Sequence, residues 1–143
     1  MNSLYTEIIL EHNKSKHNKR ELESPDAVER GHNPNCGDDL TLQLNVHDGI
    51  IIDAAYIGSG CAISQASMSI MIDLVKGLEV NEAKEKAVVF FKMVRGHELT
   101  EDEEDLLEDA TLFESLNKMP ARAKCGTLSW HCLDVGLNQF KVD

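Results

Sequence analysis

Four cysteines are the residues of this sequence best suited to chemistry: Cys36, Cys61, Cys125 and Cys132. A cysteine thiolate acts as a nucleophile or as a ligand for a soft metal, whereas a buried thiol behaves as a small apolar side chain. A glycine is next to each of the first three cysteines but not next to Cys132. Because glycine lets the backbone approach closely, we expect the first three to lie at tight junctions between elements.

The residues around Cys36 favour a metal site. Asp38 lies two positions after Cys36, so one turn offers both a thiolate and a carboxylate. Zinc accepts these ligand types together in a tetrahedral site. Four such ligands are available: Cys36, Asp38, Cys61 and Cys125. The cysteines are too far apart in sequence for a compact zinc finger, so spacing alone leaves open both a metal site and three unrelated cysteines.

Cys132 is expected to be a buried core thiol. It lies seven residues after Cys125 on the same predicted helix, which is about 10.5 Å along the helix axis. Two sulfur ligands of one zinc ion lie within about 4 Å of each other, so these two cysteines cannot share an ion. His32, four residues before Cys36, is a candidate ligand, but a loop histidine is more often solvated. Other histidines have no convergent partner in the sequence and receive no role: His12, His17, His47 and His97.

Hydrophobic periodicity predicts the elements that would position these residues. In the first half it predicts a helix over 3–13, a polar loop over 14–35, strands over 40–46 and 50–57, and a helix over 62–76. The Asp48-Gly49 pair between the strands is typical of a hairpin turn. Cys61 then falls at the joint between the second strand and the helix.

The second half predicts helices over 80–95, 100–110 and 120–140. Residues 98–114 include nine acidic residues and no basic residue, a pattern typical of a solvated helix face. Cys61 and Cys125 would lie near helix N-termini, where exposed N–H groups and the helix dipole lower the pKa of a thiol. Together the elements predict one α+β domain over residues 1–143, with a small antiparallel sheet packed against helices.

Composition and charge exclude several classes of function. The 143 residues include 14 Lys and Arg against 25 Asp and Glu, for a formal net charge of −11. Such a chain lacks the basic face that phosphate neutralisation requires, so we expect no nucleic-acid partner. No apolar run reaches the roughly 18–20 residues of a membrane span, and the first residues lack the pattern of a secretory signal. We therefore expect a soluble, cytoplasmic protein whose cysteines are not paired as disulfides.

Three cysteine motifs resemble those of the IscU/NifU-like family of iron–sulfur cluster assembly proteins. They read NPNCGD at 33–38, GSGCAIS at 58–64 and RAKCGTL at 122–128, in the order found in the family. The resemblance extends from Tyr5 to about Phe140, nearly the whole chain. It implies the SufE/NifU-like fold.

Within the family the sequence resembles the SufU branch most. The scaffold branch has a histidine immediately before its third cysteine, and this chain has Lys124. The scaffold branch also has a Leu-Pro-Pro-Val-Lys motif for a dedicated chaperone, where residues 118–122 read KMPAR. The stretch between Cys61 and Cys125 is longer by an acidic helical insertion over 96–117, which resembles an insertion of the SufU branch.

The resemblance implies a zinc-dependent sulfurtransferase that takes persulfide sulfur from a SufS-type cysteine desulfurase, whose pyridoxal phosphate belongs to the partner. By analogy, the zinc ligands are Cys36, Asp38, Cys61 and Cys125. Cys36 would be the nucleophile and Arg122 a basic residue that helps to dock the desulfurase or to hold the Cys36 sulfur. The alternative is a scaffold, not an enzyme, on which the same ligands hold iron or a transient [2Fe-2S] cluster. Either role would hand its product to downstream iron–sulfur assembly proteins.

Overall fold

A computed structural model describes residues 3–35 and 37–140, with side chains from residue 6 onward. Its elements in chain order are α1 (Ser3–Ser15), β1 (Ala27–Asn33), β2 (Asp38–His47), β3 (Ile50–Ser59), α2 (Ala62–Val75), α3 (Val80–Val94), α4 (Glu101–Leu107), the 3-10 helix η1 (Glu108–Lys118) and α5 (Pro120–Leu137). The strands form one antiparallel sheet in the order β1-β2-β3. The predicted α+β class is therefore confirmed. Within these described residues, no helix is long and apolar enough to cross a membrane.

The β2–β3 hairpin forms where the sequence predicted it. Asp48 and Gly49 both have positive φ, 51° and 77°, the requirement of a tight two-residue turn between twisted strands. Leu40, Leu42 and Leu44 alternate along β2 and are buried. This period of two gives the sheet one apolar face, which must be covered by another layer.

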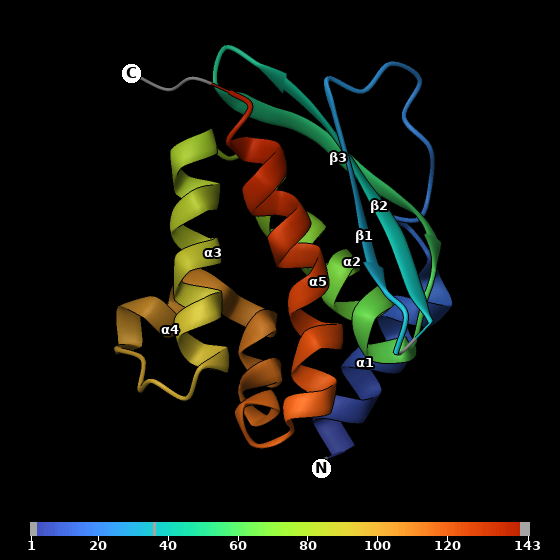
Figure 1. Ribbon diagram of the computed structural model, residues 1–143. Coiled ribbons are helices and arrows are strands. Elements are labelled where there is room, and N and C mark those ends of the chain that lie inside the picture. Colours follow the sequence, from blue (N-terminus) through green and yellow to red (C-terminus); the bar gives the residue numbers. More distant parts are fainter. Residues whose placement is uncertain (1–2, 36, 141–143) are drawn as a thin grey trace.

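The helices cover that face in layers (Figure 1). α2 and α5 pack against the sheet and against each other, and α3 lies on the side of α5 away from the sheet. The aromatic centre of the core is in this outer layer, where the Trp130 ring of α5 stacks on Phe90 of α3 with centroids 4.4 Å apart. Phe113 of η1 meets the same Phe90 ring edge-on at 6.3 Å. The core thus fixes α5 relative to the sheet on one side and to α3 on the other.

One strand was wrongly predicted as loop. β1 lies within the stretch that was predicted to be a polar loop. The prediction failed because the inward residues of β1 include Gly31 and Asn33 rather than an alternation of large apolar side chains. Gly31 is small because α5 passes close by: a Cβ there would lie 2.7 Å from the Cys132 sulfur. The strand forms because it pairs with β2 along its full length.

The acidic segment also differs from the single helix predicted for it. α4 ends at Leu107, and the chain continues as the 3-10 helix η1. The buried residues Ala110, Phe113 and Leu116 recur every three residues, which matches the 3-10 period and not the α-helical one. The acidic side chains remain largely exposed, as the charge pattern predicted.

Candidate metal centre

Three of the four candidate ligands converge at one end of the sheet. One ligand atom each from Asp38, Cys61 and Cys125 lies within 4.8 Å of the others. Asp38 begins β2, Cys61 precedes α2 and Cys125 lies in α5, so three elements meet at this point. Asp38 and Cys125 are buried and Cys61 is half-buried. Cys36, the fourth candidate, lies outside the described residues.

Asp38 is held in a way that suits a cation. Its Oδ1 accepts hydrogen bonds from the Cys61 backbone N–H at 2.8 Å and from the Ser64 hydroxyl at 2.9 Å. Its Oδ2 is buried and accepts no hydrogen bond from the residues that the structure describes. A buried acceptor without a partner costs about 1–3 kcal/mol, and more when it is charged. A metal ion beside the two sulfurs would remove this cost, so the donor set fits a metal.

Cys61 lies at the N-terminus of α2 as its cap residue. Its sulfur accepts a hydrogen bond from the Ser64 backbone N–H at 3.4 Å. This contact fixes the Cys61 sulfur at the start of α2, beside the Asp38 carboxylate.

Gly60 leaves the space in which the Asp38 carboxylate sits. A Cβ at Gly60 would lie 2.7 Å from Asp38 Oδ1 and equally close to Ser64 Oγ. Gly58 has a φ of 111°, which side chains rarely adopt, and a Cβ there would clash with the Asp39 backbone oxygen. The two glycines before Cys61 thus allow β3 and α2 to close around the carboxylate.

Cys125 is positioned by the contact between α2 and α5. The Ser67 hydroxyl of α2 donates a 2.6 Å hydrogen bond to the Gly126 carbonyl of α5. A Cβ at Gly126 would approach Leu116 of η1 to 2.3 Å. α5 begins at Pro120, so Cys125 is past the first turn, where the dipole effect fades. Cys125 thus lies within α5, whereas Cys61 lies at the start of α2.

An exposed hollow adjoins this centre. It has a volume of about 380 Å³ and is lined by two residues that precede Cys36 in the chain and by the start of α5: Asn33, Asn35, Pro120, Ala121 and Lys124. Arg122 is exposed, three residues before Cys125 on the same helix. The exposed start of α5, which leads to Cys125, thus carries two basic side chains, one of which lines the hollow.

Cys132 and His32 lie as the sequence indicated. Cys132 is buried in the core, and burial, with the nearby Glu29 carboxylate, raises the pKa of its thiol to about 11. It therefore stays protonated and unreactive at neutral pH. His32 is exposed on β1.

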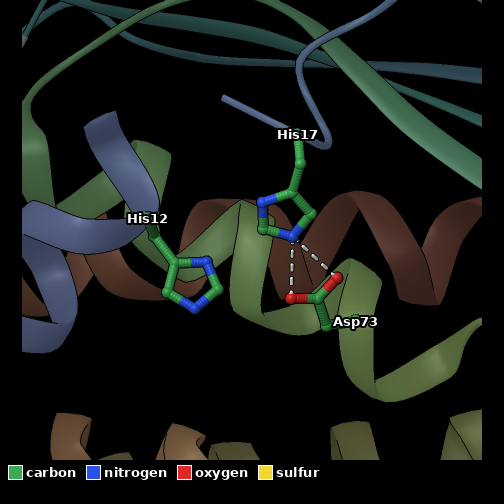
Figure 2. Close-up of side chains that lie close together, drawn as sticks. All are labelled: His12, His17 and Asp73. Carbon is green, nitrogen blue, oxygen red and sulfur yellow. Dashed lines mark hydrogen bonds and ion pairs between the residues drawn. The ribbon is translucent and has the colours of Figure 1, made fainter. Parts of the chain in front are cut away.

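A second group of candidate ligands has no signal in the sequence. His12, His17 and Asp73 each offer a ligand atom, and these atoms lie within 4.8 Å of one another (Figure 2). No role was predicted for either histidine, because Asp73 is more than fifty residues away in the chain. Only the packing of α1 on α2 brings the three together.

Comparison with known proteins gives consistent similarities. The model of the NifU-like N terminal domain matches residues 4–126. The chain is 38% identical to the iron–sulfur cluster assembly scaffold protein IscU of Thermotoga maritima over 96% of this chain and 94% of the relative. It is 36% identical to the zinc-dependent sulfurtransferase SufU of Bacillus subtilis over 96% and 91%. A scaffold and a sulfurtransferase are thus about equally similar to it.

Solved structures share the fold. A SufU protein from Fervidobacterium islandicum, described as an assembly scaffold of the SUF system, superposes with a TM-score of 0.86 at 34% identity, covering 92% of this chain and 94% of the other. The N-terminal part of a NifU-like protein from Brucella abortus gives a TM-score of 0.83 at 27% identity, covering 94% and 92%. The arrangement of sheet and helices is therefore the one these proteins share.

Proposed function

The chain belongs to the IscU/NifU-like family of iron–sulfur cluster assembly proteins, and on that premise we propose that it is a zinc-dependent sulfurtransferase of the SufU branch. It takes persulfide sulfur from a SufS-type cysteine desulfurase for iron–sulfur cluster assembly. The observation that carries the proposal is the buried Asp38 carboxylate, with Oδ2 left without a partner among the described residues, beside two cysteine sulfurs.

The proposed zinc ligands are Asp38, Cys61, Cys125 and Cys36. Bound zinc keeps its thiol ligands deprotonated at neutral pH and does no redox chemistry of its own. The chain's own contribution is to hold these groups close together. The Cys61 backbone and the Ser64 hydroxyl orient the carboxylate through Oδ1, which leaves Oδ2 for the metal.

Sulfur transfer is proposed to occur at Cys36. Its thiolate attacks the outer sulfur of the desulfurase persulfide, a new S–S bond forms on Cys36, and the S–S bond in the desulfurase breaks. The desulfurase cysteine leaves as a thiolate, so no external oxidant or reductant is needed. Exposed Lys124 lines the hollow at the start of α5, and exposed Arg122 lies two positions before it in the chain. Both side chains suit contact with the incoming enzyme or with the Cys36 sulfur.

Two features support the sulfurtransferase over a cluster scaffold. Lys124 occupies the position where the scaffold branch has a histidine, and it is exposed at the hollow. The segment over 96–117, which we regard as an insertion in the domain, contributes α4 and most of η1. The alternative function is a scaffold on which the same ligands hold a transient [2Fe-2S] cluster, and a carboxylate among them would make that cluster labile and easy to pass on.

The first test is the metal content and the visible spectrum of protein purified without oxygen. We expect at least one zinc per chain, no acid-labile sulfide and no visible absorption band. Iron with acid-labile sulfide and a visible band would instead establish the scaffold.

The second test measures stimulation of a purified cysteine desulfurase. The wild-type chain and Cys132→Ala, which alters only the core thiol, are expected to accelerate alanine release from cysteine. Cys36→Ala is expected to abolish the stimulation while the circular dichroism spectrum is retained. A Cys36→Ala protein that still accelerates the enzyme would remove Cys36 from its proposed role.

A further inference from the structure

A second cluster of metal-ligand side chains lies at the opposite end of α2 from the cysteine centre. His12 is on α1, His17 is in the loop that follows α1, and Asp73 is near the C-terminal end of α2. Asp73 is twelve positions after Cys61, about 18 Å away along the helix at 1.5 Å per residue. The cluster is therefore separate from the centre described above.

The three side chains point toward a common space (Figure 2). His17 Nε2 lies 3.1 and 3.0 Å from the two Asp73 carboxylate oxygens. Ligands of one zinc ion, with bonds of about 2.0–2.2 Å at tetrahedral angles, lie about 3.3 Å apart. The nitrogen and the carboxylate are thus already at the separation of two zinc ligands. The centroid of the His12 ring is 5.6 Å from that of His17, and His12 Nδ1 lies 2.9 Å from the Ser69 hydroxyl. The half-buried His12 ring would leave this hydroxyl and rotate to complete the set.

The buried Asn18 side chain shows that this space is rich in acceptors. Its amino group lies 2.9–3.1 Å from three acceptors, namely the Ser69 carbonyl, the Ser69 hydroxyl and Asp73 Oδ1. An amide has two hydrogens, so it cannot satisfy all three. Asn18 is fully buried, and its Oδ1 has no hydrogen-bond partner in the described part of the chain. The lone pairs in this space therefore exceed the hydrogens that the amide supplies.

The surroundings favour a divalent cation that arrives from solvent. A hollow of about 190 Å³ on one side of the cluster includes Glu11 in its lining, and a smaller one of about 100 Å³ on the other side includes Glu108 and Asp109. These carboxylates add negative potential, and the open hollows leave room for water on the metal. Two imidazoles with one carboxylate suit zinc and its neighbours better than magnesium or calcium, which prefer oxygen ligands.

We propose that His12, His17 and Asp73 form a second metal site, which binds a divalent transition metal of the zinc class and keeps at least one position open to water. Binding there joins α1 and the following loop to α2. The site does not depend on the proposed sulfur chemistry, since none of its residues belongs to the cysteine centre.

Cobalt titration of the metal-free full-length chain tests the proposal. Cobalt bound to cysteine gives a thiolate-to-metal charge-transfer band, whereas cobalt bound to histidine and aspartate does not. We expect two equivalents to bind, one with that band and one visible only by calorimetry and weak visible absorption. His17→Ala and Asp73→Asn are each expected to weaken the second equivalent about tenfold or more and to leave the first unchanged.

His47→Ala is the matched control, because His47 forms a similar exposed pair with its neighbour Asp48 at 3.3 Å but lies at the end of β2, beside the hairpin turn. It is expected to retain both equivalents. Shifts of the His12 and His17 ring nitrogens in nitrogen-15 spectra on zinc addition provide a readout that does not depend on stoichiometry. A single equivalent in the wild-type chain, or a second one that His17→Ala and Asp73→Asn leave intact, would overturn the proposal and assign His17 to an ordinary ion pair with Asp73.

Discussion

The neighbouring carboxylates Asp38 and Asp39 have opposite environments. At the scale of single residues, this difference makes one of them a candidate metal ligand and the other a member of a surface ion pair. Asp38 is fully buried, with one oxygen bonded to Cys61 and Ser64. Asp39 is partly exposed and paired with Arg30, whose hydrogen bonds hold the pKa of the Asp39 carboxyl below its usual range. Only Asp38 therefore has an oxygen available for a metal.

Asp38→Asn is expected to weaken zinc binding about tenfold or more, because the amide keeps the shape of the side chain but loses its charge. Competition with a chromophoric chelator measures the affinity. Asp39→Asn is the matched control and is expected to leave it unchanged, since an exposed ion pair contributes little. Equal affinities for the two variants would exclude Asp38 as a ligand.

Cys132 gives a prediction for alkaline pH. Burial raises the pKa of its thiol from an ordinary value of 9.0 to about 11. Between these values the unfolded chain loses this proton while the folded chain keeps it, so the free energy of unfolding decreases as pH rises. The decrease reaches about 3 kcal/mol for two pKa units. Urea unfolding from pH 8 to 11 measures it.

The Cys132→Ala variant lacks this thiol. Its free energy of unfolding is therefore expected to decrease less than that of the wild-type chain between pH 8 and 11. Other groups, such as Tyr56, whose pKa is raised by burial, titrate in both proteins and cancel in the comparison. Parallel pH profiles for the two proteins would show that the thiol ionises as easily in the folded state as in the unfolded one.

The candidate ligand residues could be predicted from the sequence only where a local motif surrounds them. The glycines beside Cys61 correctly indicate the joint between β3 and α2, whereas Cys125, predicted at such a junction, lies inside α5. Cys36 lies outside the described residues, and the spacing of the cysteines alone does not establish a shared site. The group of His12, His17 and Asp73 was missed, since nothing beside those residues in the chain marks them. Their proximity is produced by helix packing, which single-sequence periodicity does not specify.

At the scale of elements, the joint between β3 and α2 determines how closely the Asp38 carboxylate can approach Cys61. Gly60→Ala would place a methyl group 2.7 Å from Asp38 Oδ1 and Ser64 Oγ. We expect the carboxylate to move and zinc affinity to fall about tenfold or more, with the helix content retained. The same chelator competition and a circular dichroism spectrum measure both properties.

Gly136→Ala makes the same change in α5, many residues from Cys125. Its new methyl group would meet only the flexible ends of Leu44 and Glu29, at 3.2 and 3.4 Å. Zinc affinity is expected to be unchanged in this control. A Gly60→Ala protein with wild-type affinity would mean that the crowded junction relaxes without disturbing the ligand.

The elements that the sequence predicted correctly share a strong local pattern. The β2–β3 hairpin combines alternating leucines with an Asp-Gly turn, and α3 ends beside Gly96, which has a φ of 91°. β1 was missed because its inward side chains are small or polar. They fit against the nearby surface of α5 but do not produce an alternation of apolar residues in the sequence. η1 was missed because its period of three resembles an α-helical period over so short a stretch.

At the scale of the whole molecule, the candidate centre joins the sheet to both helices that cover it. Removing bound metal should therefore lower the melting temperature by roughly 5 °C or more, because even 2 kcal/mol has that effect in a chain of this size. Scanning calorimetry before and after chelation measures the change, and added zinc should reverse it. An unchanged melting temperature after confirmed zinc loss would contradict a centre that links these elements.

Hydrogen exchange would locate that effect. Amides near Asp38, Cys61 and Cys125 are expected to lose protection on chelation, while the Phe90–Phe113 region keeps it, because ring packing there needs no metal. The core is large enough for the metal-free chain to remain folded, so loss of protection throughout the chain would show that folding itself requires the metal.

The strand order β1-β2-β3 has a consequence for the moment at which the centre forms during synthesis. Each strand pairs with its neighbour in sequence across a short connection, so the sheet that places Asp38 requires little loop-closure entropy and can form early. Cys125 follows 87 positions later, roughly 4 to 17 s at the usual speed of a ribosome. An unfinished chain can thus have the sheet but not the complete ligand set, and metal occupancy becomes a mark of a molecule whose last helix has been made and docked.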